Sequence, residues 1–297
     1  MRNINEDTIT QAVLEAMTDC ENARLRSVMT SLVQHLHAFA RDVELTEAEW
    51  FEGIKFLTDA GHITDEKRQE FILLSDVLGL SMLVTAQNNA KPPGCTESTV
   101  FGPFFVDGAP QFDHGADISN GAKGAPCLVS GQVRGVDGEP IANALIDVWQ
   151  SDDDGHYDVQ SPDALGHYEH RARGRLLSGA DGGFHFRSIL AEHYPIPHDG
   201  PVGSMLAALG RHPWRPAHLH FMIQAPGYER LITHVFREGD KYLDSDAVFG
   251  VRTSLIADWV RQAPSTDGGE ENAELYTLEY DFVLNPVGQT NVLLPCG

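Results

Sequence analysis

The sequence contains no long apolar run, and this absence argues against a membrane span. Nowhere does the chain approach the roughly 20 consecutive apolar residues that a spanning helix requires. The segment from Met1 to Met17 is polar and acidic, without the apolar core of a signal peptide. We therefore expect a cytoplasmic protein that is not a membrane protein.

Cysteine is also scarce. The chain has four cysteines, and no two of them form a C-x-x-C pair. This density is too low for a disulfide scaffold. We expect reduced thiols that pack as small hydrophobic groups. The four residues are Cys20, Cys95, Cys127 and Cys296.

Basic residues are few: Lys and Arg total 21 against 43 Asp and Glu, so the formal net charge is -22. Such a chain repels the phosphates of nucleic acids and of anionic lipid headgroups. Nucleic acid is therefore not an expected partner. A small neutral substrate suits this charge better than an anion, which would require a local Arg or a metal ion.

The first part of the chain, from Thr8 to about Asn89, has the apolar spacing of helices. Between Leu25 and Leu36 apolar residues recur at intervals of three and four. Thr46-x-x-Glu49 has the form of a capping box that opens a second helix. A third helix is predicted to begin near residue 64 and to carry apolar residues from 71 to 82.

The predicted helices end at residues 91–94, Lys-Pro-Pro-Gly, because two consecutive prolines cannot continue a helix. Beyond this point, short runs of alternating or β-branched residues are separated by Gly, Asp and Pro turns. This spacing favours an antiparallel β-sandwich over alternating βαβ units. The predicted strands are 128–133, 145–150, 184–189, 218–224, 231–236 and 275–284, and 265–271 is predicted to be a loop.

These patterns predict an α+β fold with two domains. Residues 1–95 form an N-terminal helical domain, and residues 96–297 form an antiparallel β-sandwich domain. No fixed-period repeat and no long flexible linker is visible in the sequence.

Two histidines on one predicted strand are candidate metal ligands. His218 and His220 are two residues apart in the segment R-P-A-H-L-H-F at 215–221, so their side chains point to the same face of the strand. Two imidazoles on one face can share a metal ion. An H-x-H pair alone is a weak signal, because it also occurs by chance.

Other kinds of metal site fit this pair less well. A zinc protease requires histidines at i and i+4 on a helix, with an adjacent Glu. A cupin-like site requires a Glu four or five residues beyond the second His, where this chain has Gln224 and Ala225. A 2-His-1-carboxylate Fe(II) site stays open, although the sequence does not locate its carboxylate.

Two tyrosines that follow predicted strands strengthen the case. Tyr157 lies in G-H-Y-D at 155–158, and Tyr194 lies in E-H-Y-P-I-P at 192–197. With D-V-W-Q at 147–150, Gly200-Pro201 and the histidine segment, these motifs resemble the intradiol ring-cleavage dioxygenases over nearly the whole chain. Members of that family bind Fe(III) through two Tyr and two His.

The resemblance implies one Fe(III) per chain in the β-sandwich domain, held by Tyr157, Tyr194, His218 and His220. Phenolate is a hard, anionic donor that suits a ferric ion, whose charge removes the phenolic proton. By the same resemblance, substrate displaces Tyr194, which can take a substrate proton, while Tyr157 stays on the metal. Arg215 then stabilises negative charge that develops on the ring, and O2 is inserted between the two hydroxyl-bearing carbons.

Pocket positions of the family, matched onto this sequence, look most like the hydroxyquinol branch. Where catechol-cleaving members carry a Gln, fourteen residues beyond the second His, this chain has His234, which argues against the plain catechol enzymes and for the chlorocatechol and hydroxyquinol branch. Asp76 offers an acceptor for the third hydroxyl of benzene-1,2,4-triol. The matching substrate-binding residues are Leu73, Asp76, Val100, Phe101, Gly102, Pro103, Phe104, Ile196, Pro197 and Val248.

The resemblance thus predicts intradiol cleavage of hydroxyquinol by O2, to 3-hydroxy-cis,cis-muconate or maleylacetate, in aromatic catabolism. Catechol and chlorocatechols are the alternative substrates, although chlorocatechol members tend to have a shorter N-terminal segment. Two alternatives of other classes are a transthyretin-like sandwich that binds without catalysis and a Zn or Fe(II) hydrolase. Metal analysis separates these readings. A dioxygenase contains iron and shows a visible phenolate-to-Fe(III) absorption band, a binding sandwich contains no metal, and a hydrolase contains metal but lacks the band.

The N-terminal helices resemble the family's dimerisation element, so we expect a homodimer formed through these helices. In some members the same helices enclose a phospholipid between the subunits. The apolar stripe from Leu25 to Leu36 would fit a bound phospholipid, although an ordinary core within one chain explains the stripe equally well.

Overall fold

The computed structural model describes residues 2–65, 68–160, 168–263 and 274–288. The chain forms two compact units, Met1–His62 and Ile63–Gly297. The two units are defined by which residues pack together. The predicted domain boundary at residue 95 instead marks the change from helices to strands, and it stays a prediction. The loop predicted at 265–271 lies outside the described residues.

The first unit contains helices α1 (Ile9–Glu15), α2 (Ala23–Asp42) and α3 (Glu47–His62). The capping box predicted at the start of α3 is confirmed. The Thr46 amide donates to Glu49 Oε2 at 2.9 Å, and the Glu49 amide donates to Thr46 Oγ1 at 3.3 Å. Each side chain thus satisfies a backbone donor that the first turn of a helix leaves without a partner.

The apolar stripe of α2 is exposed in the single chain. Leu25, Leu32 and Leu36 keep 51%, 53% and 57% of their surface accessible, and no residue of α2 is buried. Within the first unit, the stripe is therefore not part of a buried core.

The second unit begins with α4 (Glu70–Val77) and α5 (Leu80–Asn88). The prediction of one continuous helix from near residue 64 is wrong. Gly79 adopts a left-handed backbone with φ +75°, and the two helix axes are bent by 79° there. Among the described residues, no single helix has the length and apolarity of a membrane span, and only this bent pair, taken together, passes that test of length and composition.

The rest of the second unit consists of short strands and one further helix, α6 (Pro201–Ala208), with a proline in its first turn. The strands are β1 (Pro126–Gly135), β2 (Leu145–Trp149), β3 (Arg173–Leu177), β4 (Gly183–Ile189), β5 (Tyr194–Pro195), β6 (Trp214–Arg215), β7 (His218–Gln224), β8 (Leu231–Arg237), β9 (Ile256–Ala257), β10 (Trp259–Arg261), β11 (Tyr276–Glu279) and β12 (Phe282–Leu284). Single 3₁₀ turns lie at Asp158–Gln160, Leu243–Ser245 and Thr253–Leu255.

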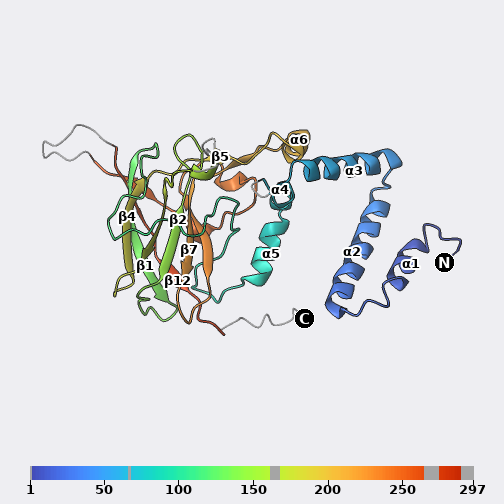
Figure 1. The fold of residues 1–297 in the computed structure, drawn as a ribbon, viewed down its shortest axis with the longest axis horizontal. Coiled ribbons are helices and arrows are strands. Elements are labelled where there is room, and N and C mark those ends of the chain that lie inside the picture. Colours follow the sequence, from blue (N-terminus) through green and yellow to red (C-terminus); the bar gives the residue numbers. More distant parts are fainter. Residues whose placement is uncertain (1, 66–67, 161–167, 264–273, 289–297) are drawn as a thin grey trace. The chain divides into compact units, whose positions relative to one another are not determined.

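Two five-stranded sheets make up the sandwich (Figure 1). One has the order β10-β11-β1-β12, with β4 also paired to β1, and the other has the order β3-β2-β7-β8-β9. The predicted α+β fold with a sandwich is confirmed, but the sheets are mixed. Strand β1 pairs in parallel with β11 and β12, and β8 pairs in parallel with β9.

The predicted strands agree with the observed ones within a few residues, apart from the last. The predicted strand 275–284 is two strands, β11 and β12, which pair with different stretches of β1. Strand β3 was not predicted at all, because its sequence R-G-R-L-L does not alternate clearly.

The sandwich core lies between the two sheets. Residues that alternate along the strands point inward from both layers, as the two-residue period of a strand requires. The inward-facing residues include Val129 and Val133 of β1, Ile146 and Val148 of β2, Phe184 and Phe186 of β4, Leu219, Phe221 and Ile223 of β7, and Phe282 and Leu284 of β12.

Candidate metal centre

Strand β7 is buried on both of its faces. Leu219, Phe221 and Ile223 face the sandwich core, so His218, His220 and Met222 face the other way. A second apolar cluster covers that outer face and contains Trp149, Tyr157, Tyr194 and Met222, with Phe104 and Phe105 packed against it. The candidate ligands thus lie on the outer face of one sheet, under a cover of aromatic side chains.

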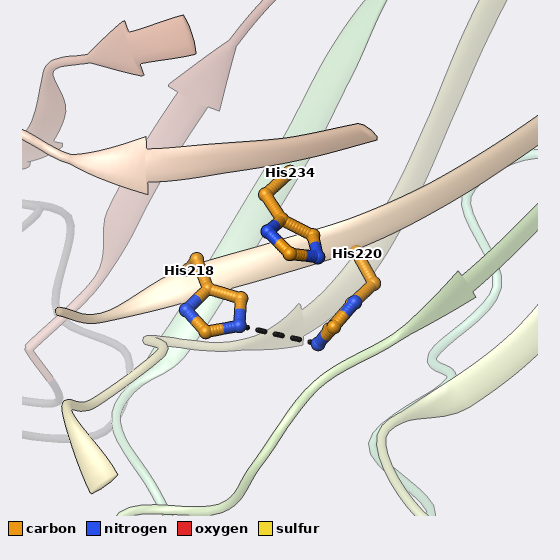
Figure 2. A group of neighbouring side chains, drawn as sticks. All are labelled: His218, His220 and His234. Carbon is orange, nitrogen blue, oxygen red and sulfur yellow. Dashed lines mark hydrogen bonds between the residues drawn. The ribbon is translucent and has the colours of Figure 1, made fainter. Parts of the chain in front are cut away.

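The two histidines of β7 approach each other closely, as Figure 2 shows. The Nε2 atoms of His218 and His220 are 3.2 Å apart, and each residue is 1% exposed. The Nδ1 atom of His218 donates to the Pro216 carbonyl at 2.7 Å, which leaves the Nε2 lone pair free to bind a metal ion. The indole of Trp149 stacks on the ring of His220, with centroids 4.7 Å apart and planes 16° apart.

Tyr157 reaches this centre from the segment that follows β2. Its hydroxyl lies 2.9 Å from Nε2 of His220, and its backbone amide donates to Gln160 Oε1 at 2.7 Å. The next residue, Asp158, forms a buried ion pair with Arg173, whose Nε donates at 2.8 Å. This pair fastens the tyrosine segment to strand β3.

Tyr194 reaches the centre from the short strand β5, which pairs with β6 in the register Tyr194 to Arg215. Its ring lies 5.3 Å from that of Tyr157, at an angle of 81°. The two tyrosine segments also touch at their backbones. A Cβ on Gly155, which has φ +80°, would lie 2.9 Å from the Tyr194 Cβ, so this position requires glycine.

Arg215 completes the centre as a buried cation. Its Nη1 lies 3.5 Å from the Tyr194 hydroxyl and 3.4 Å from Nε2 of His218. Its Nε and Nη2 donate to the two carboxylate oxygens of Asp246, at 3.0 and 3.2 Å. Burial opposes both charges, but their attraction prevails: the pKa of Arg215 is raised and the pKa of Asp246 is lowered.

His234 is a third imidazole at the same centre. It lies on β8 directly opposite His220, and the ligand atoms of His218, His220 and His234 are all within 4.8 Å of one another (Figure 2). It is 0% exposed, and neither of its ring nitrogens has a hydrogen-bond partner among the described residues.

The protonation states suit a metal ion. Burial, with the charge of Arg215, lowers the pKa of His218 to about 3, and burial also lowers the pKa of His220 well below its usual value. Both rings are therefore neutral near pH 7, which is the form that binds metal. Burial raises the pKa of Tyr157 far above 10, and the neighbouring Tyr194 adds to this. A phenolate at Tyr157 therefore requires a strong positive charge, such as a metal ion, beside it.

The spacing of the donor atoms also fits a single metal ion. Two nitrogens that each bind a metal at about 2.0–2.1 Å lie roughly 3 Å apart. The His218–His220 distance of 3.2 Å and the Tyr157–His220 distance of 2.9 Å agree with this geometry. The residues present can hold a small cation between two imidazoles and one or two phenol oxygens.

A cavity of about 700 Å³ meets this centre at Tyr194 and Arg215. Most of the predicted substrate-binding positions line it: Leu73, Asp76, Val100, Gly102, Pro103, Phe104, Ile196, Pro197 and Val248. Phe101 is not among the lining residues, and its ring packs against Phe105 and Trp149 instead. Asp76 is 9% exposed, and burial raises its pKa.

Several residues of the site were not predicted from the sequence. The cavity is also lined by Phe105, Val159, Gln160 and Tyr168, which carried no motif that marked them. Asp246 and Arg173 were missed as well, although both are buried charges that neutralise or fasten a site residue. A buried ionic partner lies far away in sequence, so only the fold shows it.

Comparisons with known proteins cover nearly the whole chain. The family model described as "Dioxygenase" matches residues 100–286, and the model described as "Catechol dioxygenase N terminus" matches residues 22–96. The chain is 64% identical over 286 residues to the 6-chlorohydroxyquinol 1,2-dioxygenase of Cupriavidus pinatubonensis, an alignment that covers 96% of this chain and 99% of that protein.

Two further relatives are hydroxyquinol 1,2-dioxygenases. The one from Nocardioides simplex is 53% identical, with 95% of this chain and 96% of that protein covered. The crystal structure of the enzyme from Pseudomonas putida superposes with a TM-score of 0.87 at 48% identity and covers 95% of this chain and 98% of that one.

Proposed function

The chain belongs to the intradiol dioxygenase family, and from this premise we propose that it cleaves hydroxyquinol, benzene-1,2,4-triol, between its two adjacent hydroxyl-bearing carbons. Both oxygen atoms of O2 enter the product, 3-hydroxy-cis,cis-muconate, whose keto form is maleylacetate. The observation that carries this proposal is the buried carboxylate of Asp76, on the wall of a cavity that reaches Tyr194 and Arg215.

We propose one Fe(III) per chain, held by Tyr157, Tyr194, His218 and His220. Support comes from the 3.2 and 2.9 Å spacings of the donor atoms and from the neutral state of both imidazoles. Two phenolates favour the ferric over the ferrous state, because their negative charge stabilises the higher oxidation state. The bound ion supplies Lewis acidity and a template for substrate and O2.

Tyr194 is the residue proposed to leave the metal and to accept a proton from a substrate hydroxyl. Of the four proposed ligands, it alone is among the described residues that line the cavity, so substrate meets its oxygen first. Tyr157 is enclosed by Phe104, which stacks on it at 4.3 Å, and by the buried Asp158–Arg173 pair. This difference in access supports different roles for the two phenols.

Arg215 has two roles in the proposed reaction. Its guanidinium keeps a full positive charge beside Tyr194, where negative charge develops as substrate loses its protons. Because Asp246 holds it through two hydrogen bonds, the charge is fixed in place before substrate arrives. A group that is already oriented stabilises the transition state without the cost of reorganisation.

Oxygen uptake with three substrates tests the assignment. We expect the iron-loaded protein to consume one O2 per benzene-1,2,4-triol, and to turn over this triol with a larger kcat/KM than catechol or 4-chlorocatechol. A 6-chlorinated triol is a further candidate, because the relative from Cupriavidus pinatubonensis is named for it. Faster cleavage of catechol by a wide margin would overturn the substrate assignment.

Replacement of Asp76 by Leu is expected to erase selectivity for the triol. The carboxylate is proposed to bind the third hydroxyl, and loss of such a hydrogen bond costs about 1–3 kcal/mol, or roughly 5- to 150-fold in kcat/KM. Catechol lacks this hydroxyl, so its kcat/KM should stay level or rise. The matched control is Asp76→Asn, which keeps an acceptor oxygen and should retain part of the selectivity. An equal fall with both substrates would contradict a role in recognition.

We also propose that two chains associate through the N-terminal helices. The exposed apolar residues of α2 support this, because a contiguous apolar stripe on a soluble helix is usually covered by a partner. Sedimentation of the 32.6 kDa chain at twice its mass would agree with a homodimer. A phospholipid between the subunits is compatible with the same stripe, and lipid extraction with mass spectrometry would detect it.

A further inference from the structure

Arg211 connects two segments that belong to different parts of the pocket wall. It follows α6, and its Nη1 donates to the carbonyl of Val77 at 2.6 Å, while its Nη2 donates to the carbonyl of Ala247 at 3.0 Å. One guanidinium thus joins the end of α4 to the segment 246–250. Arg211 is not among the described residues that line the substrate cavity.

Each carbonyl that Arg211 binds is next to a residue of the substrate cavity. Val77 follows Asp76, the carboxylate proposed to recognise the third hydroxyl, and Ala247 precedes Val248. The Val77 carbonyl is at the C-terminal end of α4, where carbonyls lack partners within the helix and a cation is favourable. A shift of either carbonyl would therefore also move the side chain of the neighbouring residue, Asp76 or Val248, which lines the cavity.

A third contact reinforces these two hydrogen bonds. The guanidinium of Arg211 lies 5.0 Å above the ring centre of Phe249, a cation–π distance. The same ring packs against Gly79, the residue between α4 and α5, where an added Cβ would lie 3.5 Å from it. Phe249 itself has φ +60°, a strained conformation for a bulky residue, which persists only where the surroundings hold it.

The segment 246–250 borders two cavities. On one side Val248 faces the substrate cavity, and on the other side Ala247 and Phe249 line a second cavity, of about 490 Å³. The segment is thus a partition between two cavities. Arg215, which lines the substrate cavity, binds Asp246, and Arg211, which lines the second cavity, binds the carbonyl of Ala247. Both arginines thus fasten the partition.

We propose that Arg211 is a positioning residue that fixes the separation of Asp76 and Val248 and thereby sets the selectivity for the ring substituents. It acts through the backbone of α4 and of the segment 246–250, without touching substrate. The inference rests on the proposed function for the identity of the substrates. That Arg211 holds α4 and the segment 246–250 together does not depend on that function.

The test compares Arg211→Met with Arg211→Lys in the iron-loaded full chain. We expect Arg211→Met to lower the ratio of kcat/KM for benzene-1,2,4-triol to that for catechol by about tenfold, which is ~1.4 kcal/mol. The change should appear mainly in KM for the triol, with iron content and the visible spectrum of the resting enzyme unchanged. Arg211→Lys keeps the charge and one donor, and should recover part of the ratio.

Hydrogen exchange supplies a readout that does not depend on turnover. In Arg211→Met, amides of both 76–80 and 246–250 should exchange faster, while those of β7 should not. The matched control is Arg261→Met, which removes an arginine at 64% side-chain exposure on β10. The control should leave exchange in both segments and the substrate ratio unchanged.

Three results would overturn the inference. The first is an unchanged substrate ratio in Arg211→Met, and the second is faster exchange in only one of the two segments. If Arg211→Met does not fold, Phe249→Leu takes its place, because it removes the cation–π contact together with the ring packing on Gly79. The third result is then an unaltered substrate ratio and unaltered exchange in both Phe249→Leu and Arg211→Lys. If the wild-type chain prefers catechol, the proposed function fails, yet the exchange result still decides whether Arg211 fastens both segments.

Discussion

Replacement of Tyr157 by Phe is expected to remove most of the bound iron and nearly all activity. Changes to groups that merely support a metal ligand reduce affinity by about 10- to 100-fold, so loss of a direct ligand should cost at least about a hundredfold in affinity. The hydroxyl of Tyr157 lies 2.9 Å from His220 Nε2 in a fully enclosed position, and Phe supplies no oxygen there. Iron content per chain and the visible phenolate-to-Fe(III) band are the measurements.

The matched variants for this prediction are Tyr194→Phe and Tyr228→Phe. Tyr194 is the ligand proposed to leave the metal, so its loss should impair turnover while the resting protein keeps more iron than Tyr157→Phe does. Tyr228, on the connection between β7 and β8, donates its exposed hydroxyl to Glu139 at 2.8 Å, and its replacement should change neither iron content nor colour. If Tyr157→Phe retained full iron content and a normal band, the proposed ligand set would be wrong.

Replacement of Arg215 by Met is expected to have the second-largest effect, because it should lower both kcat and the stability of the fold. Loss of an oriented group that stabilises developing charge lowers kcat by about 10²- to 10³-fold. The change also leaves Asp246 buried without its cation, and breaking a buried pair in this way costs about 3–5 kcal/mol of stability. Turnover should therefore be measured at a temperature where circular dichroism shows the variant to be folded.

The conservative variant separates the two effects. Arg215→Lys keeps a positive charge near Asp246 and should recover most of the stability. It should not recover kcat, because the donors of an ammonium group all radiate from one nitrogen and cannot reproduce the planar fork that binds both oxygens of Asp246 and directs Nη1 to Tyr194. A variant Arg215→Lys with wild-type kcat would show that the charge alone matters, and would contradict the role of fixed orientation.

The pH dependence of stability provides an independent check on the same pair. The folded-state pKa of Asp246 lies below its usual value of 3.8, because the attraction of Arg215 outweighs burial. A group with a depressed pKa stabilises the fold above its unfolded pKa, and this contribution is lost as the pH falls through the folded pKa. The wild-type chain should thus lose this contribution below about pH 4, and Arg215→Met should lack it at every pH.

The parts of the site that were predictable from sequence are those that local geometry controls. Because side chains alternate along a strand, the two-residue spacing of His218 and His220 was enough to place both on one face. The capping box at Thr46 was equally local. The two tyrosines needed the family resemblance, since nothing in their own segments shows that the ends of β2 and the strand β5 meet.

What could not be predicted depends on contacts between distant segments. The pairing of β1 in parallel with two C-terminal strands, the ion pair of Arg173 with Asp158 and the tie from Arg211 to Val77 each join residues whose relation only the completed fold reveals. The break at Gly79 was missed for another reason. Its flanking residues are good helix formers, and one glycine in such a stretch does not by itself signal a turn.

The contact between Gly155 and the backbone of Tyr194 has a consequence for protein engineering. A methyl group on residue 155 would displace Tyr194 itself, so the two segments that carry the proposed ligands cannot be redesigned independently. A chimera that imports only one of them from a relative inherits a steric mismatch at this point. Libraries meant to broaden the range of aromatic diols cleaved should therefore exchange residues 152–158 and 192–197 as one block.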